Sequence, residues 1–423
     1  MADAPPPRSG LAAPPQGGAA GGLTEPVPRR LLERFRVQVL NSVSANGLKQ
    51  LPAERYQTGK DLAEPDALLL RSADLHSVTI PASVRAIARA GAGTNNIPVA
   101  AMSARGVPVF NAPGANANAV KELVLAGMLM AARNLPGALR FVATLDPRAE
   151  DLEHQVEEGK KQFAGFELAG HTLGIVGLGK IGCLVADAAI KLGMNVLGFD
   201  PDITVDAAWS LPAQVKRAAS VAEVLKQAHF VTLHVPLVAA TKHLVNADNL
   251  GTMRAGAVLL NFSREGVVDD RAVLASLAQR HLGMYVCDFP NAALHGHERV
   301  LALPHLGAST REAEENCAVM VALQLRDYLE HGNVANAVNF PAVQMARESK
   351  FRIGIANANV PNMLGQISTT MANAGLNIHN MVNKSRGEMA YTLVDVDSPV
   401  LPAVLNRLAA IEGVLSVRYL PLV

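Results

Sequence analysis

The sequence predicts an α/β protein with two doubly wound parallel-sheet domains and a smaller C-terminal domain. Three observations lead to this fold class. Short β-branched runs alternate with helical patterns from Arg36 onward, a stronger series of the same kind begins at Thr172, and the pattern changes after residue 350. The chain has 423 residues, of which 49% are hydrophobic, and this is enough to fill two or three cores.

The two series predict the strands of two parallel sheets. The first contains RVQVLNSV, ALLLRS, AIARAG and PVFNAP, and the second contains TLGIVGLG, NVLGFD, HFVTLHVP, GAVLLNFS and MYVCDF. The second set consists of continuous apolar runs, as expected for a parallel sheet that is covered on both faces. Between the series, KELVLAGMLMAARNL has apolar residues at helical spacing, which predicts a helix that joins the two domains.

The C-terminal part predicts a different architecture. A long helix is expected over residues 311–331, with Gly332 as its C-cap. After it come the strand FRIGIANAN, a helix over 362–374, the strands LNIHNMVNKS and AYTLVDVD, a helix over 399–411 and the strand VLSVRYL. This βαββαβ order in about 70 residues is typical of a ferredoxin-like module.

Composition excludes several classes of protein. With 38 basic and 37 acidic residues the net charge is only +1, too small to attract nucleic acid or an anionic membrane, which favours a small-molecule substrate. The chain has no uncharged apolar stretch of about 18 residues, the length that crosses a bilayer. The three cysteines are far apart, so they predict reduced core thiols in a cytoplasmic protein, with no disulfide framework and no metal site.

The first 30 residues are dominated by Ala, Pro and Gly. Such a composition cannot bury enough apolar surface to offset the entropy of ordering, so residues 1–30 predict a disordered tail. A targeting peptide is the alternative, although the stretch lacks an apolar segment and is not rich in Ser or Arg.

A glycine-rich turn predicts a dinucleotide site in the second domain. GLGKIG begins at Gly177, follows the apolar strand TLGIV and opens a helix, which is the Rossmann-like arrangement. Gly177 permits the tight turn, Gly179 lets the backbone approach a pyrophosphate at the helix N-terminus, and Gly182 allows close packing. Asp200 ends the next strand, where it can accept from ribose hydroxyls and repel a 2′-phosphate, so NAD is favoured over NADP.

Seven sequence words identify a family resemblance. GTNNIPV, VFNAPGANANAVKELV, GLGKIG, HVPLVAATKHLV, LLNFSREGVVDD, YVCDFP and PHLGAST occur in this order, and over residues 36–340 the chain resembles the D-2-hydroxy-acid dehydrogenase family. The C-terminal module resembles an ACT domain. The resemblance implies a discontinuous substrate domain. The expected parts are the tail 1–30, a substrate domain over 31–115 and 307–346, an NAD-binding domain over 116–306 and an ACT regulatory domain over 347–423.

The resemblance also implies an activity, the NAD-dependent oxidation of D-3-phosphoglycerate to 3-phosphohydroxypyruvate, the first step of serine biosynthesis. Arg264 follows a strand at the carboxyl end of the sheet and is expected to bind the substrate carboxylate. His305 is expected to take the hydroxyl proton. The expected substrate contacts are Arg71, Ser72 and Asn116. The expected cofactor contacts are Gly177, Gly179, Lys180, Ile181, Gly182, Asp200, His234, Pro236, Phe262, Ser263, Asp288, Gly307 and Ala308.

One departure from the family pattern concerns the catalytic histidine. Members of the family usually carry a Glu a few residues after the equivalent of Asp288, where it hydrogen-bonds the histidine; here Ala292 and Ala293 stand in that zone. Glu298 is the candidate to replace it from a displaced loop. Without an orienting carboxylate, His305 is expected to transfer protons more slowly while hydride transfer persists.

The ACT resemblance implies an amino-acid effector, serine, bound between subunits, and therefore a homo-oligomer, either a dimer or a tetramer. The candidate effector residues are Asn357, Asn359 and Asn377, whose amides can donate to a carboxylate and accept from an ammonium. Asn357 stands where serine-inhibited relatives often carry His, and Asn362 replaces the usual Gly. These departures leave open whether serine or any other amino acid is the effector.

Two other functions remain open at this point. One is the reduction of another 2-oxo acid, such as 2-oxoglutarate or hydroxypyruvate. The other is a weakly catalytic NAD-sensing protein of the same fold. The missing Glu favours the sensor, whereas Arg264, His305 and Arg71 favour an enzyme.

Overall fold

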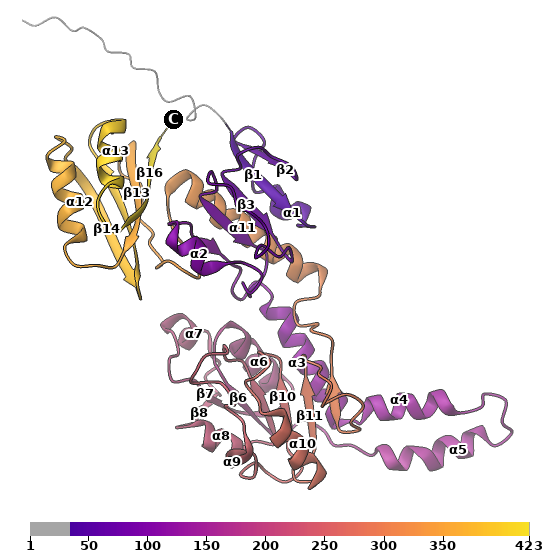
Figure 1. Ribbon diagram of the computed structural model, residues 1–423. Helices are drawn as coiled ribbons and strands as arrows, with labels where there is room; N and C mark the ends of the chain where they lie inside the picture. The colour runs from indigo at the N-terminus through magenta and orange to yellow at the C-terminus, as the bar shows by residue number, and fades with distance from the viewer. Residues whose placement is uncertain (1–33, 423) are drawn as a thin grey trace, which may run out of the picture. The chain divides into compact units, whose positions relative to one another are not determined.

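The structure, a computed structural model, describes residues 34–422, so the tail expected over residues 1–30 lies outside the described residues. The described chain contains two parallel sheets followed by one antiparallel sheet (Figure 1). This confirms the predicted fold class.

The first sheet is parallel, with strand order β2-β1-β3-β4-β5. The strand β2 has the sequence YQTG, without an apolar run, and the sequence pattern did not reveal it. The strands are β1 (Phe35–Leu40), β2 (Tyr56–Gly59), β3 (Ala67–Leu70), β4 (Ala86–Arg89) and β5 (Val109–Phe110), and the helices that accompany them are α1 (Ala45–Leu48), α2 (Val99–Ala104) and α11 (Arg311–His331).

The second sheet is also parallel, with strand order β12-β11-β10-β9-β6-β7-β8. The chain starts at β6, moves outward on one side to β8, then returns to β9 and moves outward on the other side. A ligand crevice is expected between β6 and β9, where the direction of winding reverses. The strands are β6 (Thr172–Val176), β7 (Asn195–Phe199), β8 (Lys216–Arg217), β9 (Phe230–Leu233), β10 (Val258–Asn261), β11 (Met284–Cys287) and β12 (Val300–Ala302).

Helices cover both faces of this sheet, as the apolar runs predicted (Figure 1). The expected joining helix is α3, which ends at Ala132, and the chain then forms α4 and α5, which were not predicted. The helices are α3 (Ala117–Ala132), α4 (Leu135–Thr144), α5 (Leu152–Gly159), α6 (Lys180–Lys191), α7 (Val205–Ser210), α8 (Val221–Gln227), α9 (Ala247–Leu250) and α10 (Asp270–Ala278), with a short 3₁₀ helix at Lys160–Phe163.

The third sheet is antiparallel, with strand order β14-β15-β13-β16. Its elements follow in the predicted βαββαβ order, and both helices are shorter than expected by one to three residues at each end. They are β13 (Phe351–Ala358), α12 (Met363–Ala372), β14 (Ile378–Arg386), β15 (Met389–Val396), α13 (Pro402–Ala409) and β16 (Val414–Pro421).

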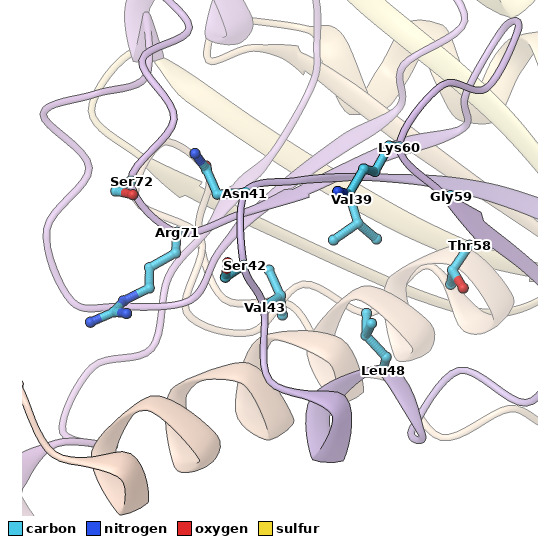
Figure 2. A pocket seen from close by; sticks show the side chains of 10 residues that line it. All are labelled: Val39, Asn41, Ser42, Val43, Leu48, Thr58, Gly59, Lys60, Arg71 and Ser72. Atoms are coloured by element: carbon cyan, nitrogen blue, oxygen red, sulfur yellow. The ribbon is translucent and has the colours of Figure 1, made fainter.

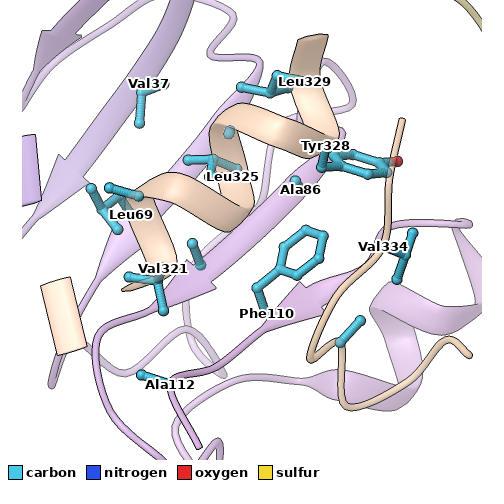
Figure 3. Close-up of a cluster of buried hydrophobic side chains, with 14 of the residues drawn as sticks. Val37, Leu69, Ala86, Phe110, Ala112, Val321, Leu325, Tyr328, Leu329 and Val334 are labelled. Atoms are coloured by element: carbon cyan, nitrogen blue, oxygen red, sulfur yellow. The ribbon is translucent and has the colours of Figure 1, made fainter. Parts of the chain in front are cut away.

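The helix α11 spans the 21 residues that the sequence predicted, and Gly332 ends it with a φ of +75°. Its apolar face packs on the first sheet, where Val321 and Leu325 lie against Leu69 and Phe110 (Figure 3). The same buried cluster includes Ala356, Tyr391 and Leu393 of the third sheet. The first sheet and the C-terminal sheet therefore share one hydrophobic core.

Side chains of the C-terminal sheet also cap the end of α11. The last carbonyl groups of a helix lack partners within the helix and carry partial negative charge, so cationic donors stabilise them. The pairs are Arg418 with the carbonyls of Tyr328 (3.1 Å) and Leu329 (3.0 Å), Arg352 with that of His331 (3.1 Å) and the Tyr391 hydroxyl with that of Gly332 (2.9 Å).

Arg352 and Asp395 form a completely buried ion pair, with the Arg352 Nε 2.6 Å from one carboxylate oxygen and an Nη 2.9 Å from the other. The remaining N–H groups of Arg352 donate to the carbonyls of His331, Met345 and Ala346. Burial alone would raise the pKa of Asp395, but the hydrogen bonds and the charge of Arg352 hold it below its usual value.

The structure also bears on the three cysteines and on the question of membrane-spanning helices. All three cysteines are buried and free, which agrees with their prediction as reduced core thiols. Within residues 34–422, no helix combines the length and the apolar character that crossing a bilayer requires.

We expect Arg352→Leu to lower the free energy of unfolding by about 3–5 kcal/mol, because it leaves the Asp395 carboxylate buried without a partner. The double variant Arg352→Leu with Asp395→Leu should recover part of this loss. Urea unfolding measures both, with Arg407→Leu on the exposed face of α13 as the control. An Arg352→Leu protein as stable as the unmodified chain would contradict the role of the pair.

Candidate active site

The glycine loop between β6 and α6 has the geometry that a dinucleotide needs. Gly177 has a φ of +94°, and a Cβ there would lie 2.5 Å from the carbonyl oxygen of His234. A Cβ at Gly182 would overlap the carbonyl of Gly177. At Gly179 nothing lies within 4 Å, so the space before the N-terminus of α6 is open. The loop therefore fits a pyrophosphate at the start of a 12-residue helix.

Asp200 follows β7 and is fixed beside this loop. One carboxylate oxygen accepts from the backbone N–H of Leu178 at 2.8 Å, and the other accepts from that of Asp202 at 2.9 Å. Each oxygen keeps a lone pair for a further donor, such as a ribose hydroxyl. The Lys180 side chain donates to the carbonyl of Pro113, and Ile181 packs against the core of the second sheet.

His234 follows β9 and faces the other side of the glycine loop, while Pro236 beyond it is exposed. Burial lowers the pKa of His234 to about 4, so the ring is neutral at neutral pH. Its Nε2 lies 3.0 Å from the Thr232 hydroxyl, and its buried Nδ1 has no partner among the described residues. His234 therefore lies beside the glycine loop as a neutral ring.

The loop after β10 is organised by Asn261, which the sequence analysis did not single out. Its Oδ1 accepts from the backbone N–H and hydroxyl of Ser263 at 3.2 and 2.8 Å, and its amide donates to the carbonyl of Arg264 at 3.0 Å. Arg264 itself donates to the carbonyl of Ser263 at 2.6 Å. Phe262 is buried against α3. A buried Asn at the end of an apolar strand is the signal that could have revealed this role.

His305 lies in the loop after β12 and has a φ of +57°, a conformation that non-glycine residues rarely adopt. The buried Asp288 holds this loop, because its two oxygens accept from the backbone N–H groups of Leu306 and Gly307, both at 2.7 Å. Burial raises the pKa of Asp288, while these hydrogen bonds and the charge of His305 oppose the rise. The ring of Phe289 packs against that of His305 at 5.2 Å.

Within the described residues, 34–422, no carboxylate takes the place of the missing Glu. Ala292 and Ala293 are exposed, and the Glu298 side chain is 82% exposed, with Arg299 as its ion-pair partner at 3.6 Å. Among residues 34–422 no hydrogen bond joins the ring of His305 to a carboxylate. His305 is therefore positioned through its backbone and the Phe289 ring.

A pocket of about 890 Å³ lies at the carboxyl ends of β1, β2 and β3. The segments Asn41–Val43, Gly59–Lys60 and Arg71–Ser72 line it, and Arg71 and Lys60 approach from opposite sides of Asn41–Val43 (Figure 2). The Arg71 guanidinium forms an ion pair of 2.7 Å with Glu314, in the first turn of α11. Arg71 and Ser72, the expected substrate contacts, therefore both line this pocket.

A third cationic side chain, that of Arg89, lies next to this pocket. The Nε of Arg89 donates to the carbonyl of Arg71 at 3.1 Å. Burial lowers the pKa of Arg89, and the nearby charges of Arg71 and Arg264 lower it further. Neither Lys60 nor Arg89 stands out in the sequence, although both lie at the carboxyl ends of strands, where parallel sheets bind ligands.

The remaining predicted residues are placed as follows. Asn116 is the N-cap residue of α3 and makes no capping hydrogen bond with its side chain. Asn357 is buried in β13; its amide donates to the carbonyl of Ala358 at 2.7 Å, and its Oδ1 has no hydrogen-bond partner among the described residues. The Asn359 amide donates to the carbonyl of Gly387, and Asn377 is exposed. Gly307 is buried beside Asp288, with Ala308 next to it.

Comparison with known proteins identifies the class. Residues 125–307 match the family described as D-isomer specific 2-hydroxyacid dehydrogenase, NAD binding domain. The D-3-phosphoglycerate dehydrogenase of Escherichia coli (strain K12) is 32% identical over 78% of this chain and 79% of its own length. That of Synechocystis is 33% identical over 95% of this chain and 72% of its own length. That of Methanocaldococcus jannaschii is 32% identical over 77% of this chain, and the match spans 62% of the archaeal protein.

Solved structures agree at the level of the fold. The TT0316 protein of Thermus thermophilus superposes with a TM-score of 0.58 at 26% identity, over 72% of this chain and 99% of that chain. The NAD⁺-bound 3-phosphoglycerate dehydrogenase of Entamoeba histolytica superposes with a TM-score of 0.56 at 23% identity, again over 72% and 99%.

The chain belongs to the D-isomer-specific 2-hydroxyacid dehydrogenase family. It is accordingly an NAD-dependent oxidoreductase that acts on a hydroxy acid.

We expect Asp200→Ala to weaken NAD binding by about 10- to 100-fold, since a charge-assisted hydrogen bond contributes roughly 1.5–3 kcal/mol. The preference for NAD over NADP should narrow as well, because the anion that repels a 2′-phosphate is lost. Titration with both coenzymes measures this, and Asp202→Ala is the matched control. An unchanged ratio of the two affinities would rule out the assigned role of Asp200.

Proposed function

We propose that this chain oxidises D-3-phosphoglycerate to 3-phosphohydroxypyruvate with NAD, the first step of serine biosynthesis. The observation that carries the proposal is the presence of three cations at the carboxyl end of the first sheet, namely Arg71 and Lys60, which line the pocket, and Arg89, which donates to the carbonyl of Arg71. A substrate with a phosphate and a carboxylate needs several cations, and an unphosphorylated hydroxy acid needs fewer. The names of the relatives from E. coli and Synechocystis support the same substrate.

Arg264 is the proposed anchor of the carboxylate and of the C2 oxygen. Its planar guanidinium can donate two parallel hydrogen bonds, and Asn261 fixes the loop that carries it. As the C2 oxygen gains charge during the reaction, the guanidinium stabilises that charge more strongly than it stabilises the neutral hydroxyl.

His305 is the proposed base. Its ring takes the proton of the C2 hydroxyl while the carbonyl forms, and it returns that proton in the reverse reaction. The Asp288 carboxylate holds the His305 loop through the N–H groups of Leu306 and Gly307, so the ring keeps its position without a carboxylate of its own. NAD, when bound, supplies the hydride acceptor.

The residues proposed to bind NAD are those whose geometry fits this cofactor. The glycine loop would receive the pyrophosphate and Asp200 the adenosine ribose, with His234 beside the glycine loop. Asp288, with lone pairs beyond its two backbone partners, would accept from the nicotinamide amide.

The same proposal extends to regulation and assembly. The βαββαβ module is proposed as an ACT domain with a small amino-acid effector, for which Asn359 and Asn377 remain candidates. A homo-oligomer is also proposed, because α4 exposes apolar side chains to solvent, with Leu139 71% and Val142 59% exposed. The cytoplasm remains the predicted compartment.

One observation favours a second candidate, a weakly catalytic NAD-sensing protein. No carboxylate orients the His305 ring within the described part of the chain, so proton transfer is expected to be slow. Reduction of 2-oxoglutarate or hydroxypyruvate is the alternative enzyme activity, because Arg264 would bind the carboxylate of either substrate.

Turnover of the full chain with NAD and D-3-phosphoglycerate, compared with unphosphorylated D-glycerate, tests the proposal. We expect Arg71→Gln to raise the KM for D-3-phosphoglycerate about 10- to 100-fold more than that for D-glycerate, because one charge-assisted contact to phosphate is lost. Glu314→Gln should lower the KM for the phosphorylated substrate, since Glu314 competes for Arg71.

Three other outcomes would change the proposed substrate or function. Equal effects of Arg71→Gln on both substrates would overturn the phosphate site. Preferred turnover of 2-oxoglutarate or hydroxypyruvate would establish the alternative enzyme, and NAD binding without turnover of any of these substrates would establish the sensor.

We further expect Ala293→Glu to increase the rate of 2-oxo-acid reduction and to maintain it to higher pH. A carboxylate beside the imidazole favours the protonated ring that reduction requires. One charge-assisted hydrogen bond limits the gain to roughly 10- to 100-fold. The pH profile of reduction measures the change, with Ala292→Gln as the uncharged control. If Glu298→Gln alone slows the unmodified enzyme and Ala293→Glu has no effect, then Glu298 already provides this carboxylate.

A further inference from the structure

A second cavity, of about 280 Å³, lies between the first-sheet domain and the strand β16. It is separate from the substrate pocket, and the two share no lining residue. The segments 82–85 and 105–107 form one wall, Tyr328 of α11 contributes to another, and residues 416–419 of β16 complete it. The proposed dehydrogenase reaction gives this cavity no role.

Three arginines line the cavity, and they come from three different segments. They are Arg85, Arg105 and Arg418. Among the described lining residues there is no Asp or Glu. Arg85 has its Nε 3.7 Å from the carboxylate of Asp66, which lies outside the lining. Like charges gathered in a partly enclosed space repel one another, so a counter-anion there would be stabilised.

Backbone carbonyls orient two of these guanidinium groups without neutralising them. Arg105 donates to the carbonyls of Ile80 at 3.1 Å and Pro81 at 2.7 Å. Arg418 donates to two carbonyls at the end of α11, at 3.1 and 3.0 Å. Each guanidinium has five N–H donors, so each retains donors beyond these contacts.

Arg418 provides the sharpest indication of a ligand. Arg418 as a whole is only 8% exposed. Its guanidinium carbon lies 4.3 Å from the centre of the Tyr328 ring. Its buried Nε has no hydrogen-bond partner among residues 34–422. A buried cationic donor without a partner is uncommon in a native protein, and an acceptor at this site would satisfy it.

We propose that this cavity binds a small organic or inorganic anion through a carboxylate or phosphate group, at a site distinct from both the substrate pocket and the residues Asn359 and Asn377. The anion bridges Arg105 of the first-sheet domain and Arg418 of the C-terminal domain. The two walls already touch beside it, where the Ser416 hydroxyl donates to the carbonyl of Gly106 at 3.0 Å. Binding therefore strengthens the attachment of the C-terminal domain.

The test uses the full chain, with inorganic phosphate as the probe and chloride at matched ionic strength as the reference. Phosphate should raise the thermal midpoint of the unmodified chain, since a ligand of the folded state alone stabilises it. Because phosphate also fits the substrate pocket, the measurement is repeated in Arg71→Gln, where the response of the second cavity should persist. Acetate then distinguishes a site for carboxylates from one for phosphate only.

Arg105→Gln in the Arg71→Gln background should lose this response, whereas removal of an exposed arginine elsewhere, Arg407→Gln, should not. Ala82→Glu gives an independent check, because it places a carboxylate at an exposed position on the rim without removing any hydrogen bond. It should raise the midpoint phosphate concentration at least tenfold.

A phosphate response that is unchanged in both Arg105→Gln and Ala82→Glu would overturn the proposal, as would a response that Arg71→Gln abolishes completely. Turnover with D-3-phosphoglycerate is measured separately in Arg105→Gln and should be close to that of the unmodified chain. The dehydrogenase assignment and the anion site can thus fail independently.

Discussion

The helix α11 is the element on which the rest of the structure depends, because it is held at both ends by charged groups from other parts of the chain. At its first turn Glu314 pairs with Arg71 of the substrate pocket, and the His305 loop precedes it in sequence. At its last turn, arginines of the C-terminal sheet occupy its free carbonyls. Its apolar face fills the core of the first sheet.

Buried polar residues, more than apolar packing, determine the local geometry of the site. Asn261 and Asp288 are each 2% exposed, and their side-chain oxygens accept from N–H groups of the loops that carry Arg264 and His305. A buried carboxylate or amide without such partners would be costly, so these contacts hold the loops of Arg264 and His305 firmly. The free-energy cost of breaking these buried hydrogen bonds therefore fixes the positions of Arg264 and His305.

Positive charge is distributed unevenly over a chain whose net charge is only +1. Arg71 and Arg264 both lie within electrostatic range of Arg89, and burial makes the ionised state of Arg89 less favourable. A site that gathers cations in this way reduces the stability of the empty protein and gains affinity for an anionic substrate, because the substrate relieves the repulsion. The ion pair of Arg71 with Glu314 offsets part of this repulsion when no substrate is bound.

The sequence by itself determined the order of strands and helices, the dinucleotide loop and the length of α11. These features depend on local rules, namely apolar runs, glycine positions and helix caps, that act over a few residues. It did not reveal β2, β8, β12 and α5, which are short or have weak apolar signals, or α4, which follows α3 closely and has Pro136 and Gly137 in its first turn. It also did not reveal Lys60, Arg89 and Asn261, which resemble ordinary strand-end residues until the sheet brings them together. Only the tertiary structure decided that Asp288 holds the His305 loop, that Glu314 meets Arg71 and that the C-terminal sheet caps α11. Each of these joins residues that are distant in the chain, and their contact is set by the packing of whole elements, which no local pattern records.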